Sequence, residues 1–575
     1  MSTTLPFPRN MNSTSESGPR ATEGEPKSID ERSSSGAWTL MGDEAIALGA
    51  LHAGVSSAYA YPGTPSTEIM ESFQSWKAAR SAPGCPEATM GALLAEWCSN
   101  EKTAYESALG ASFAGRRAMV SMKHVGLNVA ADPFVNSALI RINGGLVVVV
   151  ADDPGMHSSQ DEQDTRALAD FARVPCFEPA NQQEAYDMTR AAFDFSERHE
   201  VPVVIRVTTR LAHSRSIVAL AAPRAPNQLH KAEADRSWIL MPAVARRRWK
   251  VLLEKQATFL AHAEESARLE AGSAELGVIA CGIARQYLLE NLGDYEAAFG
   301  AKPTILTINA YPMPVGRIRE FAAKVKRILV LEEGYPLVED AMLGVFGAPV
   351  PVAGRRSGAL PLDGELSPEL VRTALGLPAR ALLPASSLVP PERPPQFCQG
   401  CPHGDSFSAL KEALKPYPEY AVNSDIGCYT LGALPPWNAI ESCVDMGASV
   451  GMARGAAGAG LLPAVAVIGD STFYHSGLPN LVDAVSHNTN ITLVILDNDT
   501  TGMTGAQPTI APASRFIPLL QGIGVDPAHI RELKAHRSDH ATNVGIIAEE
   551  LAHEGPSVII MVRECIEWAK KLRNI

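Results

Sequence analysis

The sequence lacks an apolar run long enough to cross a membrane. Runs such as Leu146 to Val150 and Val465 to Ile468 fall far short of the roughly 18 apolar residues that a spanning helix needs. Positive charge is not in excess either, because 50 Lys and Arg stand against 63 Asp and Glu, and the basic residues are scattered. Nucleic-acid-binding surfaces need clustered basic residues. The sequence therefore predicts a soluble protein that does not bind DNA or RNA.

Cysteine and aromatic residues are also scarce. Nine cysteines are an odd number for a chain of 575 residues, and no secretory signal is visible, so we expect no disulfide framework and a reducing, cytoplasmic location. Thiols in such a chain are candidates for metal or cluster ligation. Only 6% of the residues are aromatic whereas 46% are hydrophobic, and 45 glycines complete a composition typical of tightly packed α/β layers.

Strand-like and helical segments alternate from Trp38 onward. This alternation predicts βαβ units on parallel sheets, and at about 150 residues per domain the length allows three or four domains. Composition marks the boundaries, because polar, charged and proline-rich stretches separate the alternating segments. The expected units are a disordered tail (1–36), a first α/β domain (37–225), a helical connector (226–272), a second α/β domain (273–382), a linker (383–396) and a third α/β domain (397–575).

Two strand ends in the third domain carry the strongest local motif. AVAVIGD ends at Asp470 and ITLVILDN ends at Asn498, with one helical segment between them. Ligands bind at the carboxyl ends of parallel strands, so both side chains are expected at one edge of the sheet. With the carbonyl of Thr500 they offer three oxygens to Mg²⁺, and nearby glycines leave room for phosphates. The residues expected around a metal and a diphosphate are Gly469, Asp470, Ser471, Asn498, Thr500 and Gly502.

The spacing of 28 positions between Asp470 and Asn498 matches the thiamine diphosphate motif. The structural alternative is an ordinary aspartate that caps a helix, with Asn498 in a turn. A dinucleotide-binding loop is excluded by order, because the glycine-rich segment 455–460 precedes its strand instead of following it.

The first domain contains YPGTPSTE (61–68) and EWCSNEKTAYESALGAS (96–112). With these segments the chain resembles the 2-oxoacid:ferredoxin oxidoreductases, and among them the indolepyruvate-type α subunits, over about residues 40–575. The resemblance implies three doubly wound parallel-sheet domains of the thiamine diphosphate-binding type: a pyrimidine domain, a transketolase C-terminal-like domain and a diphosphate domain. It also implies thiamine diphosphate and Mg²⁺ as cofactors.

Individual residues of the first domain acquire expected roles from the resemblance. Glu101 is expected to be the catalytic glutamate on the aminopyrimidine ring of the cofactor, with Glu96 as a rival. Thr64 is expected on the cofactor and substrate side of the site. Each candidate has a structural alternative, such as a solvated acid or lysine, a hydrogen-bonded histidine or an ion-paired arginine. The remaining candidates are His124 and His475 as proton carriers and Lys123 and Arg166 as ligands of a substrate carboxylate.

Four cysteines have ligand-like positions. Cys398 and Cys401 form a C-x-x-C at the start of the third domain, Cys428 follows 27 positions later, and Cys565 ends the last strand. Thiolates from a tight loop and neighbouring loops bind iron–sulfur clusters in this way, so one 4Fe-4S cluster is expected. A zinc site or buried free thiols are the alternatives.

The resemblance implies an enzyme that decarboxylates and oxidises a 2-oxoacid, with an aryl pyruvate such as indolepyruvate favoured, to the acyl-CoA. Coenzyme A, a ferredoxin-like electron acceptor, a smaller second subunit and a dimer or hetero-oligomer are implied in the same way. Related α subunits continue into a ferredoxin-like module that this sequence lacks, so we expect electrons to leave for another protein. Two alternatives stay open: a non-oxidative thiamine diphosphate-dependent decarboxylase, lyase or carboligase, and a noncatalytic assembly subunit.

Overall fold

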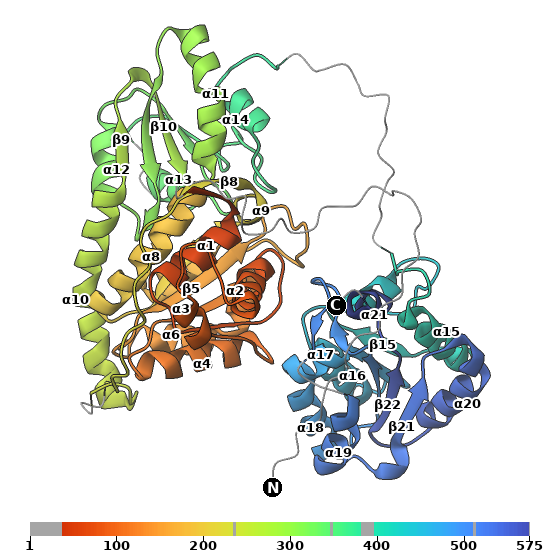
Figure 1. Cartoon of the computed structure of the whole chain (residues 1–575). Helices are drawn as coiled ribbons and strands as arrows, with labels where there is room; N and C mark the ends of the chain where they lie inside the picture. Colours follow the sequence, from red (N-terminus) through yellow and green to blue (C-terminus); the bar gives the residue numbers. More distant parts are fainter. Residues whose placement is uncertain (1–36, 234–236, 345–348, 381–395, 510–512, 574–575) are drawn as a thin grey trace, which may run out of the picture.

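The computed structural model describes residues 37–233, 237–344, 349–380, 396–509 and 513–573 (Figure 1). The predicted disordered tail and almost all of the predicted linker lie outside these residues. Within the described ranges, no helix is both long and apolar enough to cross a membrane.

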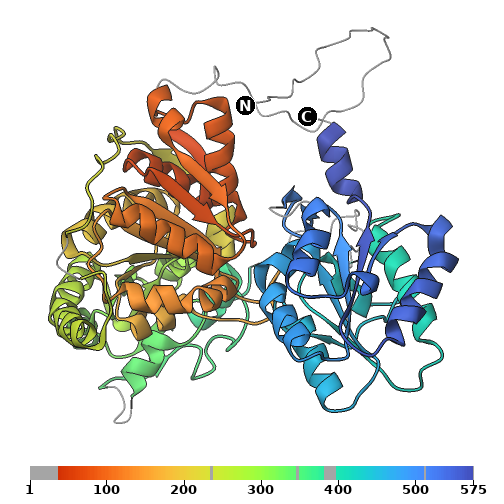
Figure 2. The same ribbon diagram turned by 90° about the horizontal axis from the view of Figure 1, so that it is seen from below.

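The chain forms two lobes, which lie side by side in Figures 1 and 2. The N-terminal lobe extends to residue 380 and has one continuous hydrophobic core from Leu40 to Leu377. The C-terminal lobe, drawn in blue tones, begins at residue 396 and has its own two hydrophobic clusters. The parallel-sheet α/β class predicted from the sequence is confirmed in both lobes.

A seven-stranded sheet with the order β12-β6-β7-β5-β4-β2-β3 forms the centre of the N-terminal lobe. All neighbouring strands are parallel except β12, which pairs antiparallel to β6. Its central strands are continuous apolar runs, because helices cover both of their faces. The strands are β2 (Ser57–Ala60), β3 (Leu94–Trp97), β4 (Ala118–Lys123), β5 (Leu146–Asp152), β6 (Cys176–Phe177), β7 (Val203–Thr208) and β12 (Ala310–Tyr311).

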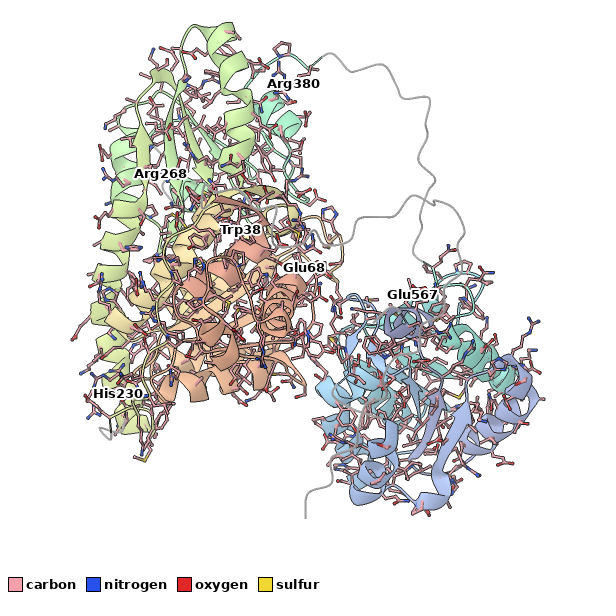
Figure 3. All side chains as sticks on the ribbon, in the orientation of Figure 1. Trp38, Glu68, His230, Arg268, Arg380 and Glu567 are labelled. Carbon is pink, nitrogen blue, oxygen red and sulfur yellow. The ribbon has the colours of Figure 1, made fainter. Side chains whose placement is uncertain are left out.

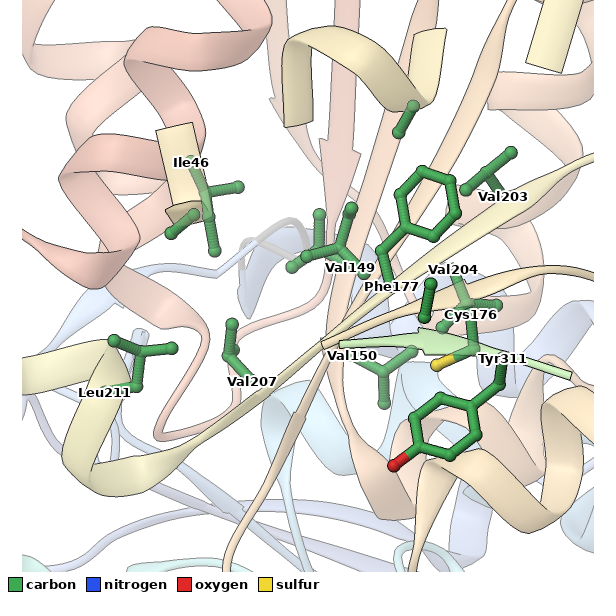
Figure 4. Close-up of a cluster of buried hydrophobic side chains, with 14 of the residues drawn as sticks. Ile46, Val149, Val150, Cys176, Phe177, Val203, Val204, Val207, Leu211 and Tyr311 are labelled. Atoms are coloured by element: carbon green, nitrogen blue, oxygen red, sulfur yellow. The ribbon is translucent and has the colours of Figure 1, made fainter. Parts of the chain in front are cut away.

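The core between this sheet and its helices is shown in Figure 4, where Val149, Val150 and Val204 lie near Cys176 and Tyr311. A two-stranded antiparallel ribbon of β1 (Ala37–Met41) and β8 (Arg215–Ala219) lies beside the sheet. The helices are α1 (Gly42–His52), α2 (Thr67–Ala79), α3 (Glu87–Ala92), α4 (Glu101–Phe113), α5 (His124–Val129), α6 (Ala131–Ser137), α7 (Thr165–Ala172), α8 (Gln182–His199) and α9 (Thr209–His213).

A second sheet in the same lobe has the order β14-β13-β10-β11-β9 and follows the long helix α10 (Pro242–Ser266). Because β12 belongs to this part of the chain and yet pairs with β6, the two sheets share one core. The strands are β9 (Arg268–Glu270), β10 (Ser273–Cys281), β11 (Pro303–Ile308), β13 (Ile328–Leu331) and β14 (Val352–Ala353), and the helices are α11 (Ala284–Phe299), α12 (Val315–Ala322), α13 (Leu337–Leu343) and α14 (Pro368–Ala374).

The C-terminal lobe contains a six-stranded, wholly parallel sheet with the order β16-β15-β17-β18-β22-β21. Alternate residues of β17 enter different clusters, since Val465 and Val467 pack into one and Ala466 and Ile468 into the other. The sheet is therefore covered on both faces. Its strands are β15 (Ala421–Ser424), β16 (Ser442–Cys443), β17 (Ala464–Gly469), β18 (Thr492–Asp497), β21 (Ile530–Lys534) and β22 (Ser557–Val562).

Helices and short elements complete this lobe. The α-helices are α15 (Pro402–Leu414), α16 (Ala448–Gly458), α17 (Asp470–Thr472), α18 (Leu478–Ser486), α19 (Phe516–Gly522), α20 (His540–Leu551) and α21 (Ile566–Arg573). The short elements are η2 (Cys428–Ala433), the π-helical turn η3 (Phe473–Gly477), η4 (Ala513–Arg515), η5 (Pro527–His529), η6 (Arg537–Asp539) and the ribbon of β19 (Thr500–Thr501) and β20 (Gln507–Pro508).

Candidate functional site

A cavity of about 640 Å³ lies where the two lobes meet. This volume is within the range of ordinary small-molecule and cofactor sites. Both lobes contribute predicted site residues to its wall. They are Thr64, Glu101 and Lys123 from the N-terminal lobe and Cys428, Gly469, Asp470, Ser471, Asn498, Thr500 and Gly502 from the C-terminal lobe.

Asp470 stands at the end of β17, beside the strand that leads to Asn498. Its Oδ1 accepts a hydrogen bond from the backbone N–H of Ser471 at 2.7 Å, but its buried Oδ2 has no hydrogen-bond partner. Burial, helped by the neighbouring Asp497 carboxylate, raises the pKa of Asp470 to about 8. A buried carboxylate oxygen without a hydrogen-bond donor raises the free energy of the folded protein. A cation bound at this edge of the cavity would remove that penalty.

Asn498 follows β18 and lies beside Asp470's strand, as predicted from their spacing. Its Oδ1 accepts a hydrogen bond from Thr500 N at 3.2 Å, and its Nδ2 lies 3.3 Å from His403 Nε2. The neighbouring Gly469 has no room for a side chain, because a Cβ there would lie 2.6 Å from the ring of Tyr429. The chain therefore presents bare backbone and oxygen atoms at this edge, which is the donor set that Mg²⁺ and a diphosphate require.

Glu101 is the first residue of α4, directly after the N-cap Asn100. Its Oε2 lies 2.8 Å from Nε2 of His475 in the C-terminal lobe, and Asn100 donates to the His475 carbonyl at 2.9 Å. Gly126 packs on the same carboxylate, since a Cβ there would lie 2.5 Å from Oε1. The ring of Tyr61 stands edge-on to His475, with 4.7 Å between centroids. Contacts from both lobes thus fix the Glu101 carboxylate at the cavity wall.

Thr64, in the turn after β2, and Lys123, at the end of the neighbouring strand β4, line the cavity. Ser158 joins them, because its hydroxyl donates to the Thr64 carbonyl at 3.1 Å and its carbonyl accepts from Lys123 Nζ at 2.9 Å. Burial lowers the pKa of Lys123, although Asp153 and Asp161 oppose this effect. Lys123 therefore presents a buried amine to any anion bound in the cavity.

Arg166 lies outside this cavity, which corrects its predicted role as a substrate ligand. Its side chain is 1% exposed and forms ion pairs with Asp164 at 2.6 Å and Glu332 at 3.0 Å. Its remaining donors bind Tyr311 Oη and backbone carbonyls. The guanidinium is fully used by the N-terminal lobe, so no donor is left for a substrate carboxylate.

His124 is also absent from the cavity wall, unlike its neighbour Lys123. Its Nε2 lies 3.1 Å from the carbonyl of Asp161, and its Nδ1 is buried without a partner. The predicted proton carrier therefore does not line the cavity, whereas the other candidate, His475, does.

The four predicted cluster cysteines gather on one side of the cavity. Cys401 N donates to Cys398 O at 3.0 Å, and Cys565 N donates to the carbonyl of Asn498 at 3.0 Å. Burial raises the pKa of Cys428 to about 12, and the charges of the other three thiols add to this effect. The loop after β18 passes close by, since a Cβ on Gly502 would lie 3.3 Å from Cys428 Sγ.

These thiols are less compact than the ligands of a tetrahedral zinc site. Tetrahedral zinc with Zn–S bonds of about 2.3 Å needs sulfur atoms about 3.8 Å apart. Among the residues that the structure describes, no three of the four sulfurs lie within 4.8 Å of one another. A larger inorganic group suits this wider arrangement.

Several cavity residues had no assigned role in the sequence analysis: Tyr61, His403, Tyr429 and Ser476. His403 is the clearest case, because it stands two positions after the C-x-x-C and burial lowers its pKa to about 4. Its position after Cys401 was a usable signal. Asp425 and Tyr429 flank Cys428 and hydrogen-bond to each other, a contact that no spacing rule indicates.

Two known families match parts of the chain. Residues 48–266 match "Pyruvate flavodoxin/ferredoxin oxidoreductase, thiamine diP-bdg", and residues 425–561 match "Thiamine pyrophosphate enzyme, C-terminal TPP binding domain". The first match includes Thr64, Glu101 and Lys123, and the second includes Asp470 and Asn498. The matched segments therefore supply the two walls of the cavity.

Curated relatives cover most of the chain. Indolepyruvate oxidoreductase subunit IorA of Archaeoglobus fulgidus is 37% identical over 569 residues, which cover 93% of this chain and 88% of the relative. IorA of Methanothermobacter thermautotrophicus is 38% identical over 485 residues, or 82% of this chain and 76% of the relative. Among solved structures, a 2-oxoglutarate:ferredoxin oxidoreductase from Magnetococcus marinus is 17% identical, with a TM-score of 0.47 over 62% of this chain and 68% of that one.

Proposed function

The chain belongs to the 2-oxoacid:ferredoxin oxidoreductases, in the group of indolepyruvate oxidoreductase subunits, and from this premise we propose its substrate and its site residues. It is an oxidoreductase that oxidises a 2-oxoacid with thiamine diphosphate. The proposed substrate is an aryl pyruvate such as indolepyruvate, and the proposed product is the acyl-CoA. Coenzyme A and the aryl substrate are inferred from family membership.

One observation carries the proposal for the site. Glu101 from the N-terminal lobe and the unpartnered Oδ2 of Asp470 from the C-terminal lobe face the same cavity. An acid on one wall and a cation site on the other are what a cofactor with an aminopyrimidine at one end and a diphosphate at the other requires. The donor set therefore fits thiamine diphosphate with Mg²⁺.

The residues have separate tasks in this proposal. Asp470, Asn498 and Thr500 hold Mg²⁺ and through it the diphosphate, and the hydroxyl of Ser471 adds a donor beside them. Glu101 binds a ring nitrogen of the aminopyrimidine. When bound, thiamine diphosphate supplies the nucleophile and the electron sink that a 2-oxoacid needs in order to lose carbon dioxide.

The N-terminal wall positions the substrate. Lys123 Nζ is linked to Thr64 through Ser158, and it pairs with the carboxylate of the 2-oxoacid. Thr64 orients the keto group through its hydroxyl. Burial of this wall excludes water, which strengthens the attraction between the ammonium and the carboxylate.

Cys398, Cys401, Cys428 and Cys565 are proposed to hold one 4Fe-4S cluster. When bound, the cluster accepts electrons one at a time. The exposed Cys398 lies on the outer side of the group, so an electron acceptor reaches the cluster there. A ferredoxin-like protein and a smaller second subunit are the proposed partners.

Replacement of Glu101 by Gln tests the proposal. The chain is purified anaerobically with its second subunit and supplied with thiamine diphosphate, Mg²⁺, coenzyme A and indolepyruvate, and reduction of a viologen dye is followed. Loss of the acid is expected to lower turnover at least about 100-fold. Glu96→Gln, which changes an exposed acid on β3, serves as the matched control and retains activity. Equal activity of Glu101→Gln and wild type would overturn the role of Glu101, and aldehyde release without dye reduction would favour a non-oxidative enzyme.

A further inference from the structure

Three side chains from separate helices of the N-terminal lobe converge away from the cofactor cavity. Asp43 lies in the first turn of α1, Glu68 in the first turn of α2 and His213 at the end of α9. One ligand atom of each side chain lies within 4.8 Å of the other two. Among the described residues, they form the one group of three or more His, Cys, Asp or Glu with this compact arrangement.

Asp43 is the unusual member of the group. It is 0% exposed, and neither of its carboxylate oxygens has a hydrogen-bond partner. A buried acid with two unsatisfied oxygens is costly, and native proteins avoid it unless the oxygens have a task. The neighbouring Glu44 does not relieve this cost, because it is an acid itself and already accepts from Met41 N at 2.8 Å.

The other two members form an ion pair with each other at the same point. Glu68 Oε2 and His213 Nε2 are 3.5 Å apart, and neither atom has a hydrogen bond. Their side chains are 33% and 34% exposed, although the two ligand atoms themselves are buried. Figure 3 labels Glu68 in the same lobe as Trp38.

We propose that Asp43, Glu68 and His213 bind one divalent cation of the zinc class. An imidazole nitrogen with two carboxylates is a donor set that Zn²⁺ accepts readily, whereas Mg²⁺ and Ca²⁺ prefer oxygen ligands alone. A cation satisfies the Asp43 oxygens and joins three helix ends. The three residues do not line the cofactor cavity, so this site is separate from the proposed Mg²⁺ site.

The cation also bears on the loop that carries Thr64. Glu68 stands four positions after Thr64, and the turn between them is fixed by Gly63 N donating to Thr67 Oγ1 at 3.1 Å and by Ser66 Oγ donating to Gly63 O at 2.8 Å. A metal ion on Glu68 therefore anchors the start of α2 and, through this turn, the cavity wall.

Equilibrium dialysis against Zn²⁺ tests the proposal. Full-length protein with its cluster, thiamine diphosphate and saturating Mg²⁺ is dialysed against low micromolar Zn²⁺, and bound zinc and iron are counted per chain. Wild type is expected to bind one more equivalent of Zn²⁺ than Asp43→Asn and His213→Gln, at equal iron content. Asp43→Asn keeps the shape of the side chain, and His213→Gln changes a partly exposed residue, so the second variant gives the answer if the first does not fold.

His157→Gln is the matched control. His157 lies 3.7 Å from the single carboxylate of Glu365 and lacks a second acid, so this variant is expected to keep the extra equivalent. A second readout is the melting temperature, which Zn²⁺ raises in wild type and His157→Gln but not in Asp43→Asn or His213→Gln. Equal zinc content in all four proteins would overturn the proposal.

Discussion

The amine of Lys123 lies on the cavity wall, and we propose that it binds the carboxylate of the 2-oxoacid. Its side chain is 9% exposed, and burial lowers its pKa. A bound anion therefore stabilises the protonated form of this buried amine. The stem packs against the loop of Thr64, because a Cβ on Gly63 would lie 3.2 Å from it. The position of Lys123 is thus fixed before any substrate binds.

Lys123→Met is expected to raise the KM for the 2-oxoacid about 10- to 100-fold, because a hydrogen bond to a charged group is worth about 1.5–3 kcal/mol. Steady-state kinetics with varied oxoacid measure the change. Lys102→Met, which alters an exposed lysine on the outside of α4, is the control and leaves KM unchanged. An unchanged KM in Lys123→Met would remove this residue from the substrate site.

Asp425 makes stability depend on pH. Burial raises its pKa to about 7, although hydrogen bonds from the Ser449 and Tyr429 hydroxyls work in the other direction. Because the folded protein then holds a proton that the unfolded chain has lost, stability of the C-terminal lobe falls as pH rises from about 4 to about 7 and levels off above 7. The slope from this one group is at most about 1.4 kcal/mol per pH unit.

Asp425→Asn removes this contribution, so its denaturant midpoint changes less than that of wild type between pH 5 and pH 8. Unfolding of the C-terminal lobe is followed by denaturant titration at both pH values. The control is Asp483→Asn, since Asp483 is 61% exposed on α18. Parallel pH profiles of wild type and Asp425→Asn would show that Asp425 ionises normally.

At the scale of elements, the sequence predicted those strands and strand ends whose positions depend only on nearby residues. Asp470 and Asn498 end two apolar strands that are one crossover apart, and parallel pairing brings such ends together. The alternation of strand-like and helical segments likewise predicted the second α/β unit, which contains β10, β11 and β13. Local sequence was sufficient to predict the position of a side chain that stands at the end of a predicted strand.

Contacts between distant segments were not predictable in this way. The partners of Arg166 include Glu332, 166 positions away, and nothing in the local pattern of either segment shows that they meet. The two-residue strand β12 is too short to have a period, and it joins the first sheet from the second part of the lobe. His475 contacts Glu101 only because the two lobes pack against each other, and no local sequence pattern shows how they pack.

Three elements converge on the cysteine group: the loop before α15, η2 and the end of β22. Arg563 links two of them, since its guanidinium donates to Asp405 at 2.8 Å and to the carbonyl of Gly400 at 3.1 Å. The end of β22 thereby fixes the C-x-x-C loop, and Cys565 is carried by the same short segment. Tertiary contacts of Arg563 thus help to bring the cysteine group together.

Cys565→Ser is expected to lose most of the iron and the broad visible absorbance of an anaerobic preparation, because one of four thiolates is missing. Iron per chain and the absorbance spectrum are the measurements. Cys443→Ser is the control, since Cys443 is half-buried beside Thr430 and outside the group, and it retains both signals. Zinc in place of iron in an air-free wild-type preparation would contradict the cluster assignment.

At the scale of the whole molecule, the N-terminal lobe is held together by buried charge as well as by its core. Arg206 on β7 is 0% exposed and binds Asp152 Oδ2 at 2.6 Å, with Glu178 and the Glu333 carbonyl as further acceptors. Glu333 follows β13, a strand of the second sheet. The network therefore ties the sheet that carries Glu101 and Lys123 to the sheet beside it.

Removing one partner of a buried pair leaves the others without compensation, which costs about 3–5 kcal/mol. Arg206→Met is expected to lower the free energy of unfolding of the N-terminal lobe by this amount, measured by denaturant titration. The control is Arg210→Met, because Arg210 is 43% exposed and its pair with Glu365 is worth at most about 1 kcal/mol. If the free energy of unfolding falls by the same small amount in both variants, the two sheets are joined by the hydrophobic core alone, and the buried charges only compensate one another. If Arg206→Met loses the larger amount, the wall that holds Glu101 depends on charges far from the cavity.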